Sequence, residues 1–127
     1  MAYEVFSRTS VRVEEPSVSI TLDRRIVLNS AAARIFTKAG VRTVLLLWDQ
    51  TNRKLAIKAT HREDKNGYAV SLPHNGHSGS IRAKSFLNYI GWSAQQRENL
   101  SATWDESEKM LEATLLAKHL GLQKAKT

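Results

Sequence analysis

The sequence predicts a mostly β protein with short helices, an α+β chain made of two tandem β-α-β-β units. Short segments in which apolar and polar residues alternate predict strands. Two short helical stretches each end at a glycine, which indicates two helices set between strands. The phrase VLLLWDQTNRKL (44–55) returns as LSATWDESEKML (100–111), and these hold the two Trp-Asp pairs of the chain.

The first unit, residues 17–60, begins with an alternating strand at 18–22 and a short extended piece at 26–28. Ser30 is placed to cap a helix that carries apolar residues at helical spacing, and Gly40 is placed to end it. A β-branched and leucine-rich run at 41–48 predicts a central strand. After a turn, residues 54–59 alternate again and predict its hairpin partner.

A linker, 61–79, holds a strand at 68–72 and a loop rich in glycine and polar residues. The second unit, 80–116, repeats the order of elements. Ser85 is placed to cap a short helix that Gly91 ends, and strands are expected at 100–104 and 109–115. The residues after the second unit, 117–127, are expected to form a tail.

Two sets of matches align the units. Ile26, Ser30 and Ile35 match Ile81, Ser85 and Ile90 at a constant offset, and Trp48, Asp49 and Leu55 match Trp104, Asp105 and Leu111 one residue further along. Residues 107–120 are rich in Glu, Lys, Leu and Ala, so propensity alone favours a helix there. The repeat favours a hairpin strand instead, and we follow the repeat because strand pairing often overrides propensity.

The chain of 127 residues fits a single domain, 1–127. No run approaches the ~18 apolar residues of a membrane span, so no membrane association is expected. The start, MAYEVFSR, shows no signal peptide, and cysteine is absent. A cytoplasmic protein is the expectation from these features.

The net charge of +7 is concentrated in one part of the chain. Residues 23–62 hold nine Lys and Arg against two acidic residues, whereas residues 93–127 hold five of each. Such a one-sided balance favours a polyanionic partner, with nucleic acid first and an anionic membrane surface second. The alternative is a basic globular protein without such a partner.

The segment LDRRIVLNSAAAR (22–34) resembles the SpoVT/AbrB superfamily of swapped-hairpin barrels, in the MraZ-like arrangement with two units in one polypeptide. The family phrase has an aspartate, a basic turn ending in arginine, an alternating strand, a helix start and another arginine. Asp23, Arg25 and Arg34 fit that order. The resemblance implies one swapped-hairpin barrel, of the cradle-loop type, that binds DNA as a transcriptional regulator or antitoxin-like module.

The chain also departs from the family pattern. Arg24 stands where the family usually has glycine, and Asn29 stands where it has proline at the helix start. The second unit offers only Arg82 and Lys84 in the matching region. Other cradle-loop barrels, such as RIFT and double-psi barrels, have the same element order and bind peptides, metals or small molecules.

We expect DNA, as a duplex, to be the partner, held at its phosphates and guanine edges by arginine and lysine. The turn between the first strands and the following helix would contribute most. The candidate DNA-binding residues are Arg24, Arg25, Arg34, Lys38, Arg42, Arg53, Lys54, Arg82 and Lys84.

Neither a catalytic nor a metal site is expected, nor is a cofactor. GHSGS (76–80) differs from a nucleophile elbow at its last residue, and His74 and His77 have no nearby cysteine or carboxylate cluster to complete a metal site. Glu106, Glu108 and Glu112 read as a solvated face. The second hypothesis is a non-enzymatic module that binds a protein or forms a homo-oligomer.

Overall fold

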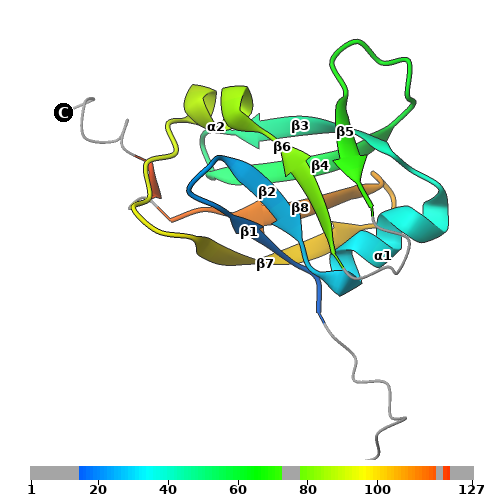
Figure 1. Cartoon of the computed structure of the whole chain (residues 1–127), viewed down its shortest axis with the longest axis horizontal. Coiled ribbons are helices and arrows are strands. Elements are labelled where there is room, and N and C mark those ends of the chain that lie inside the picture. Colours follow the sequence, from blue (N-terminus) through cyan, green and yellow to red (C-terminus); the bar gives the residue numbers. More distant parts are fainter. Residues whose placement is uncertain (1–14, 73–77, 117–118, 121–127) are drawn as a thin grey trace, which may run out of the picture.

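A computed structural model describes residues 15–72, 78–116 and 119–120, and it is mostly β with two helices (Figure 1). The elements in chain order are β1 (Ser17–Ile20), β2 (Arg25–Leu28), α1 (Ser30–Ala39), β3 (Thr43–Asp49), β4 (Lys54–Thr60), β5 (Tyr68–Ser71), β6 (Gly79–Arg82), α2 (Lys84–Ile90), β7 (Glu98–Asp105) and β8 (Met110–Thr114). Neither of these helices has the length and apolar character needed to cross a membrane.

The strands form a closed antiparallel barrel in the order β1-β2-β6-β5-β3-β4-β8-β7. Alternate side chains of each strand point into the barrel, and Ile26, Leu55, Ile81 and Leu111 are almost completely buried there. Burial of such side chains is the main stabilising contribution to a small domain. In this order β2 and β6 lie on the side of the barrel opposite β4 and β8.

The two helices lie at opposite sides of the barrel in Figure 1. Both contribute to the common core, α1 with Phe36 and α2 with Phe86, Leu87 and Ile90. Gly40 and Gly91 both adopt the left-handed conformation that ends a helix, as the sequence predicts.

The helix starts differ from the sequence prediction. Asn29, not Ser30, caps α1, because its Oδ1 accepts a hydrogen bond from the amide of Ala32 at 2.9 Å. The same amide side chain bonds Ser17 N and Glu15 O, so it also fixes the entry to β1. Ser85 lies inside α2, whose N-cap is Ala83 without a side-chain hydrogen bond.

The hairpin strand predicted at 109–115 is confirmed as β8, and no helix forms at 110–114. Leu111 and Ala113 point into the core, and β8 pairs with β4 on one side and β7 on the other. Two ladders of backbone hydrogen bonds and this burial outweigh the helix propensity of the segment.

The linker predicted to run through residue 79 ends one residue earlier, because β6 starts at Gly79. A Cβ atom on Gly79 would lie 2.8 Å from Leu72 Cδ2 and 3.1 Å from the carbonyl oxygen of Ser71. The glycine therefore serves a close approach of β5 to β6.

Candidate nucleic-acid interface

The turn between β1 and β2 is closed by backbone hydrogen bonds that fix Arg24 at its end. The amide of Arg24 bonds the carbonyl oxygen of Thr21 at 3.1 Å, and Thr21 N bonds Arg25 O at 3.0 Å. Arg24 has φ 66°, in the left-handed region that favours glycine. The chain thus holds an arginine in a strained backbone position at the tip of a hairpin.

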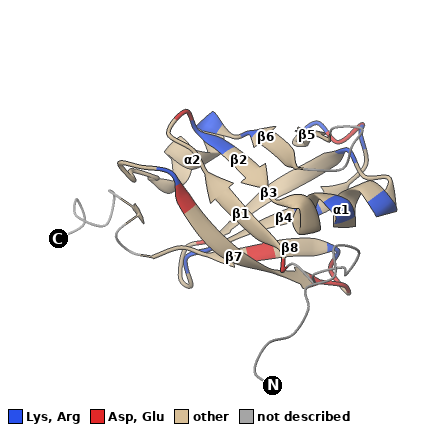
Figure 2. Cartoon of the chain, turned by 60° about the horizontal axis from the view of Figure 1, so that its bottom comes forward, with Lys and Arg blue, Asp and Glu red and all other residues tan. Residues whose placement is uncertain are grey.

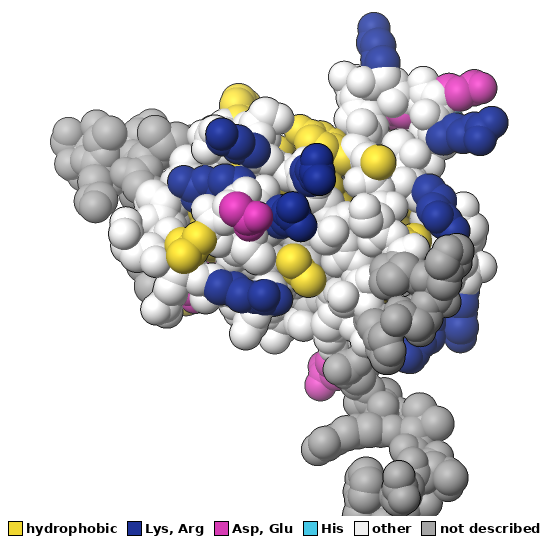
Figure 3. Space-filling model, in the orientation of Figure 1, with side chains coloured by type: hydrophobic (Ala, Val, Ile, Leu, Met, Phe, Trp, Pro, Cys, Tyr) yellow, Lys and Arg dark blue, Asp and Glu magenta, His cyan; other side chains and the backbone are white. Residues whose placement is uncertain are grey.

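The ladder between β2 and β6 brings basic residues from both halves of the chain together. Arg25 pairs with Arg82, and both side chains are exposed on the outer face of the barrel. The amide of Ala83 bonds the carbonyl oxygen of Arg24 at 3.2 Å, so Lys84 begins α2 beside the turn. We call Arg24, Arg25, Arg82 and Lys84 the basic cluster. In Figure 3, Lys and Arg side chains gather over this end of β2, β6 and α2.

One acidic residue lies within the basic cluster. The carboxylate of Asp23 lies 3.3 Å from Arg25 Nε. The hydrogen bond from Thr21 Oγ1, followed by the charge of Arg25, lowers the pKa of Asp23 from its ordinary value. Arg24, Arg82 and Lys84 form no ion pair with other residues in the described part of the chain.

The outer face of β2, β6 and β5 continues from the basic cluster toward Arg42. Val27 and Ser80 pair two residues along from Arg25 and Arg82 and point the same way. They line an open pocket of about 650 Å³ together with Ser71 and Arg42. This face is therefore bounded by basic residues at both ends.

Arg34 and Lys38 are exposed one turn apart on α1. Figure 2 shows basic positions on α1 and at the start of β2. The α1 helix touches the β6 end of this face, where the position of a Cβ on Gly79 lies 3.6 Å from Ala33 Cβ. Arg34 and Lys38 are thus exposed basic positions on a helix that packs against the start of β6.

Arg53 and Lys54 belong to a different surface from the basic cluster. They lie at the β3–β4 hairpin, on the β4 side of the barrel. Arg53 Nε donates to the carbonyl oxygen of Leu115 at 3.3 Å, and Lys54 lines a pocket with Asp49 and Glu112. The structure separates these two candidates from the others.

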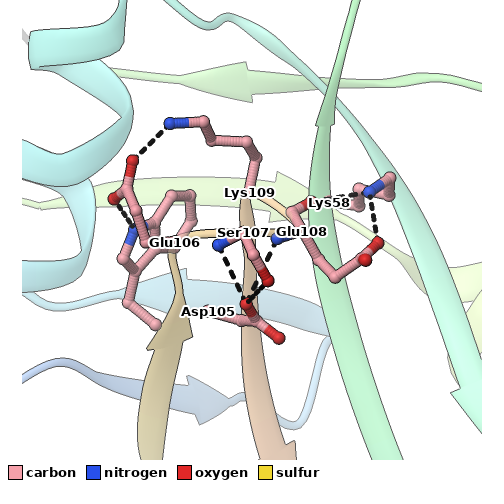
Figure 4. A network of polar contacts seen from close by, with 7 residues as sticks. Lys58, Asp105, Glu106, Ser107, Glu108 and Lys109 are labelled. Atoms are coloured by element: carbon pink, nitrogen blue, oxygen red, sulfur yellow. Dashed lines mark hydrogen bonds and ion pairs between the residues drawn. The ribbon is translucent and has the colours of Figure 1, made fainter.

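The two Trp-Asp pairs have structural roles at the ends of β3 and β7. Asp105 Oδ1 accepts hydrogen bonds from Ser107 Oγ at 2.8 Å, Ser107 N at 3.0 Å and Glu108 N at 3.1 Å (Figure 4). These bonds, that of the Ser107 side chain first, lower the pKa of Asp105. Asp49 accepts from the side chain and amide of Asn52 in the same way. Trp48 and Trp104 pack against the core.

Two acidic residues of the second hairpin, Glu106 and Glu108, form ion pairs. Glu106 contacts Lys109, and Glu108 Oε1 lies 3.3 Å from Lys58 Nζ. Over the described ranges, no three His, Cys, Asp or Glu residues come together in a way that could hold a metal ion. His74 and His77 lie outside the described residues.

A pocket of about 440 Å³ beside the basic cluster was missed from the sequence. It is lined by aromatic residues from β3, β5 and α2, among them Tyr68 and Tyr89. The only signal for this pocket in the sequence is the four-residue spacing of Ser85 and Tyr89 after Lys84, which places both side chains on the same face of a helix. The pairing that brings β5 next to β3 cannot be read from local periodicity.

Comparisons with protein-family models, curated proteins and solved structures found no match to this chain.

Proposed function

We propose that the protein binds DNA at its phosphates, as a transcriptional regulator or an antitoxin-like module, with the basic cluster as the main contact surface. One observation carries the proposal: Arg25 and Arg82 face each other on neighbouring strands, with Arg24 and Lys84 beside them. Arginine forks bind phosphate oxygens with two parallel hydrogen bonds. Four basic side chains against one acid favour a polyanion.

The size of the basic surface also supports contacts with several phosphates. Arg42 bounds the far end of the β2-β6-β5 face, and Arg34 and Lys38 are exposed on α1. Ser71 and Ser80, between the two ends, offer hydroxyl donors to the same backbone. Arg53 and Lys54 have no part in this proposal.

We further infer that the barrel consists of two related units. Ile26 pairs with Ile81, and Ala56 pairs with Glu112. The sequence alignment makes the members of each pair equivalent. If the two units are related by a two-fold axis that passes through the middle of both ladders, a residue next to the axis must pair with the equivalent residue of the other unit. Both pairs meet this requirement. The two ladders lie on opposite sides of the barrel, as one axis demands.

Contacts between hairpins and helices support the swapped arrangement. Trp104, from the second hairpin, packs edge-on against Phe36 of α1 at 5.7 Å between ring centroids. Trp48, from the first hairpin, lines a pocket with Phe86 of α2. The left-handed Arg24 adds to the family resemblance, since the family usually has glycine there.

The experiment is a mobility-shift titration at low salt with duplex and single-stranded DNA. The double variant Arg24→Ala and Arg25→Ala should weaken binding across sequences while the circular dichroism spectrum stays unchanged. Lys54→Ala with Lys65→Ala is the matched control, because it removes the same charge elsewhere. Affinity of the native protein should fall steeply with added salt. Absence of binding to both forms of DNA would reject the proposal.

A second candidate function is self-association or protein binding. Leu47, Ala56 and Met110 line an open pocket of about 220 Å³ on the outer face of β3, β4 and β8, and Leu47 is exposed. Exposed apolar surface of this kind marks interaction sites in other proteins. Discrete oligomers in light scattering, insensitive to salt and nucleic acid, would favour this function over DNA binding.

A further inference from the structure

The pocket beside the basic cluster has walls of aromatic side chains. Trp48 from β3, Tyr68 from β5, and Phe86 and Tyr89 from α2 line its volume of about 440 Å³. Tyr89 is 76% exposed, so its ring stands largely free at the rim. In Figure 3, hydrophobic surface is visible between α2 and β5, next to the Lys and Arg side chains.

The pocket also carries hydroxyl groups and no carboxylate among the described residues that line it. Tyr68 Oη and Ser85 Oγ lie 3.2 Å apart, and each can also donate to or accept from a ligand. The neighbouring pocket over Ala56 differs, since two carboxylates, Asp49 and Glu112, line it against one cation, Lys54.

Cations adjoin the pocket on the side of the basic cluster. Lys84 directly precedes Ser85, which lines the pocket. Arg82, the last residue of β6, lies two residues before Lys84 in the sequence. A flat, hydrogen-bonding, aromatic ring attached to a phosphate would place the ring in the pocket and the phosphate on the cluster. This is the chemistry of a nucleotide.

We propose that the pocket binds an unpaired nucleobase, so that the ligand of the basic cluster is single-stranded nucleic acid. The inference rests on the proposed function and narrows it. Aromatic side chains stack on bases only where the base faces are free, as in single strands, whereas a duplex keeps those faces covered. The duplex expected from the sequence would engage the cluster alone.

The test compares three ligands of equal length at low salt by fluorescence anisotropy: an oligothymidine, its duplex with oligoadenosine, and an abasic deoxyribose-phosphate chain. Oligothymidine should bind most tightly. Tyr89→Ala should weaken oligothymidine binding on the order of tenfold and leave the abasic chain unaffected. Leu116→Ala, which also removes an exposed apolar side chain but outside the pocket, is the matched control. Lys84→Ala should weaken all three ligands and reduce the salt dependence.

The outcomes separate the two proposals. Equal affinity for oligothymidine and the abasic chain, or equal behaviour of Tyr89→Ala and Leu116→Ala, would overturn the base pocket while leaving phosphate binding intact. Failure of all three ligands to bind would overturn both. A concentration-dependent oligomer that Tyr89→Ala dissociates, without any effect on nucleic-acid binding, would assign the pocket to a second copy of the chain and also overturn this inference.

Discussion

Arg25 on β2 and Arg82 on β6 are direct cross-strand neighbours on the outer face of the barrel. Like charges in this position destabilise an antiparallel sheet. The cost is reduced in part by Asp23, which lies 3.3 Å from Arg25 Nε. A polyanion placed over both guanidinium groups would remove the rest of the repulsion. The repulsion between Arg25 and Arg82 is therefore consistent with the proposed function.

The substitution Arg82→Glu therefore has opposite effects on stability and on binding. It replaces a repulsive pair by an attractive one, so the free energy of unfolding should rise by about 0.2–1 kcal/mol. DNA affinity should fall, since a phosphate contact becomes a repulsion. Urea denaturation and anisotropy measure the two quantities. A variant that loses stability or keeps full affinity would contradict the role given to this pair.

Removing the cap of α1 should destabilise the protein. Asn29→Ala deletes the bond to Ala32 N and the two bonds to Ser17 N and Glu15 O. We expect a loss of about 1–2 kcal/mol in the free energy of unfolding. Ser30→Ala serves as the control and should change stability by less than about 0.5 kcal/mol. A larger loss of stability in Ser30→Ala than in Asn29→Ala would contradict the assignment of the cap to Asn29.

Glycine at Lys109 should stabilise the second hairpin. Lys109 has φ 55°, and its ion pair with Glu106 is exposed and contributes little. Lys109→Gly relieves the left-handed strain, so a gain of up to about 1 kcal/mol is expected in thermal unfolding. Gln50→Gly, at a turn position without positive φ, should give no gain. A loss of stability at Lys109→Gly would show that the ion pair outweighs the strain.

Stability should decrease as the pH falls below about 4. Hydrogen bonds lower the pKa values of Asp49 and Asp105 in the folded state, first those of the Asn52 and Ser107 side chains. Each carboxylate therefore adds stability above the pKa of the unfolded chain, and that stability is lost as protons bind to the folded state. Asp105→Asn should flatten the acid limb of a plot of unfolding midpoint against pH. Glu63→Gln, which alters a loop carboxylate without a hydrogen bond to the described residues, should leave it unchanged.

Local sequence patterns predicted where the helices and strands lie better than they predicted which strands pair with each other. Gly40 and Gly91 end helices as predicted, because a left-handed residue after a helical stretch is a local signal. Ser30 was predicted as a cap and Asn29 is one; both residue types serve equally well, and the choice depends on contacts with β1. The closed barrel has a ring order with non-sequential neighbours, such as β2 with β6, that no local pattern contains.

The candidate DNA-binding residues fall on two separate surfaces because strand pairing, which local patterns do not contain, decides which of them lie together. Arg24 and Arg25 are adjacent in the sequence and were expected to act together. Arg82 joins them only because β6 pairs with β2. Arg53 also belongs to the basic residues of 23–62, but it lies across the barrel from Arg25 and Arg82. Its position in the sequence does not reveal this. The pocket around Tyr89 draws on three elements and depends wholly on the fold.

The most direct test of the account is amide chemical-shift mapping of the ¹⁵N-labelled protein during titration with DNA at low salt. We expect the largest amide shift changes at Arg24, Arg25, Arg82 and Lys84, and little change in the amide signals of Arg53, Lys54 and Lys109. Shifts centred on the turn residues 50–53 and 106–109, or no shifts at saturating DNA, would contradict the proposed contact surface.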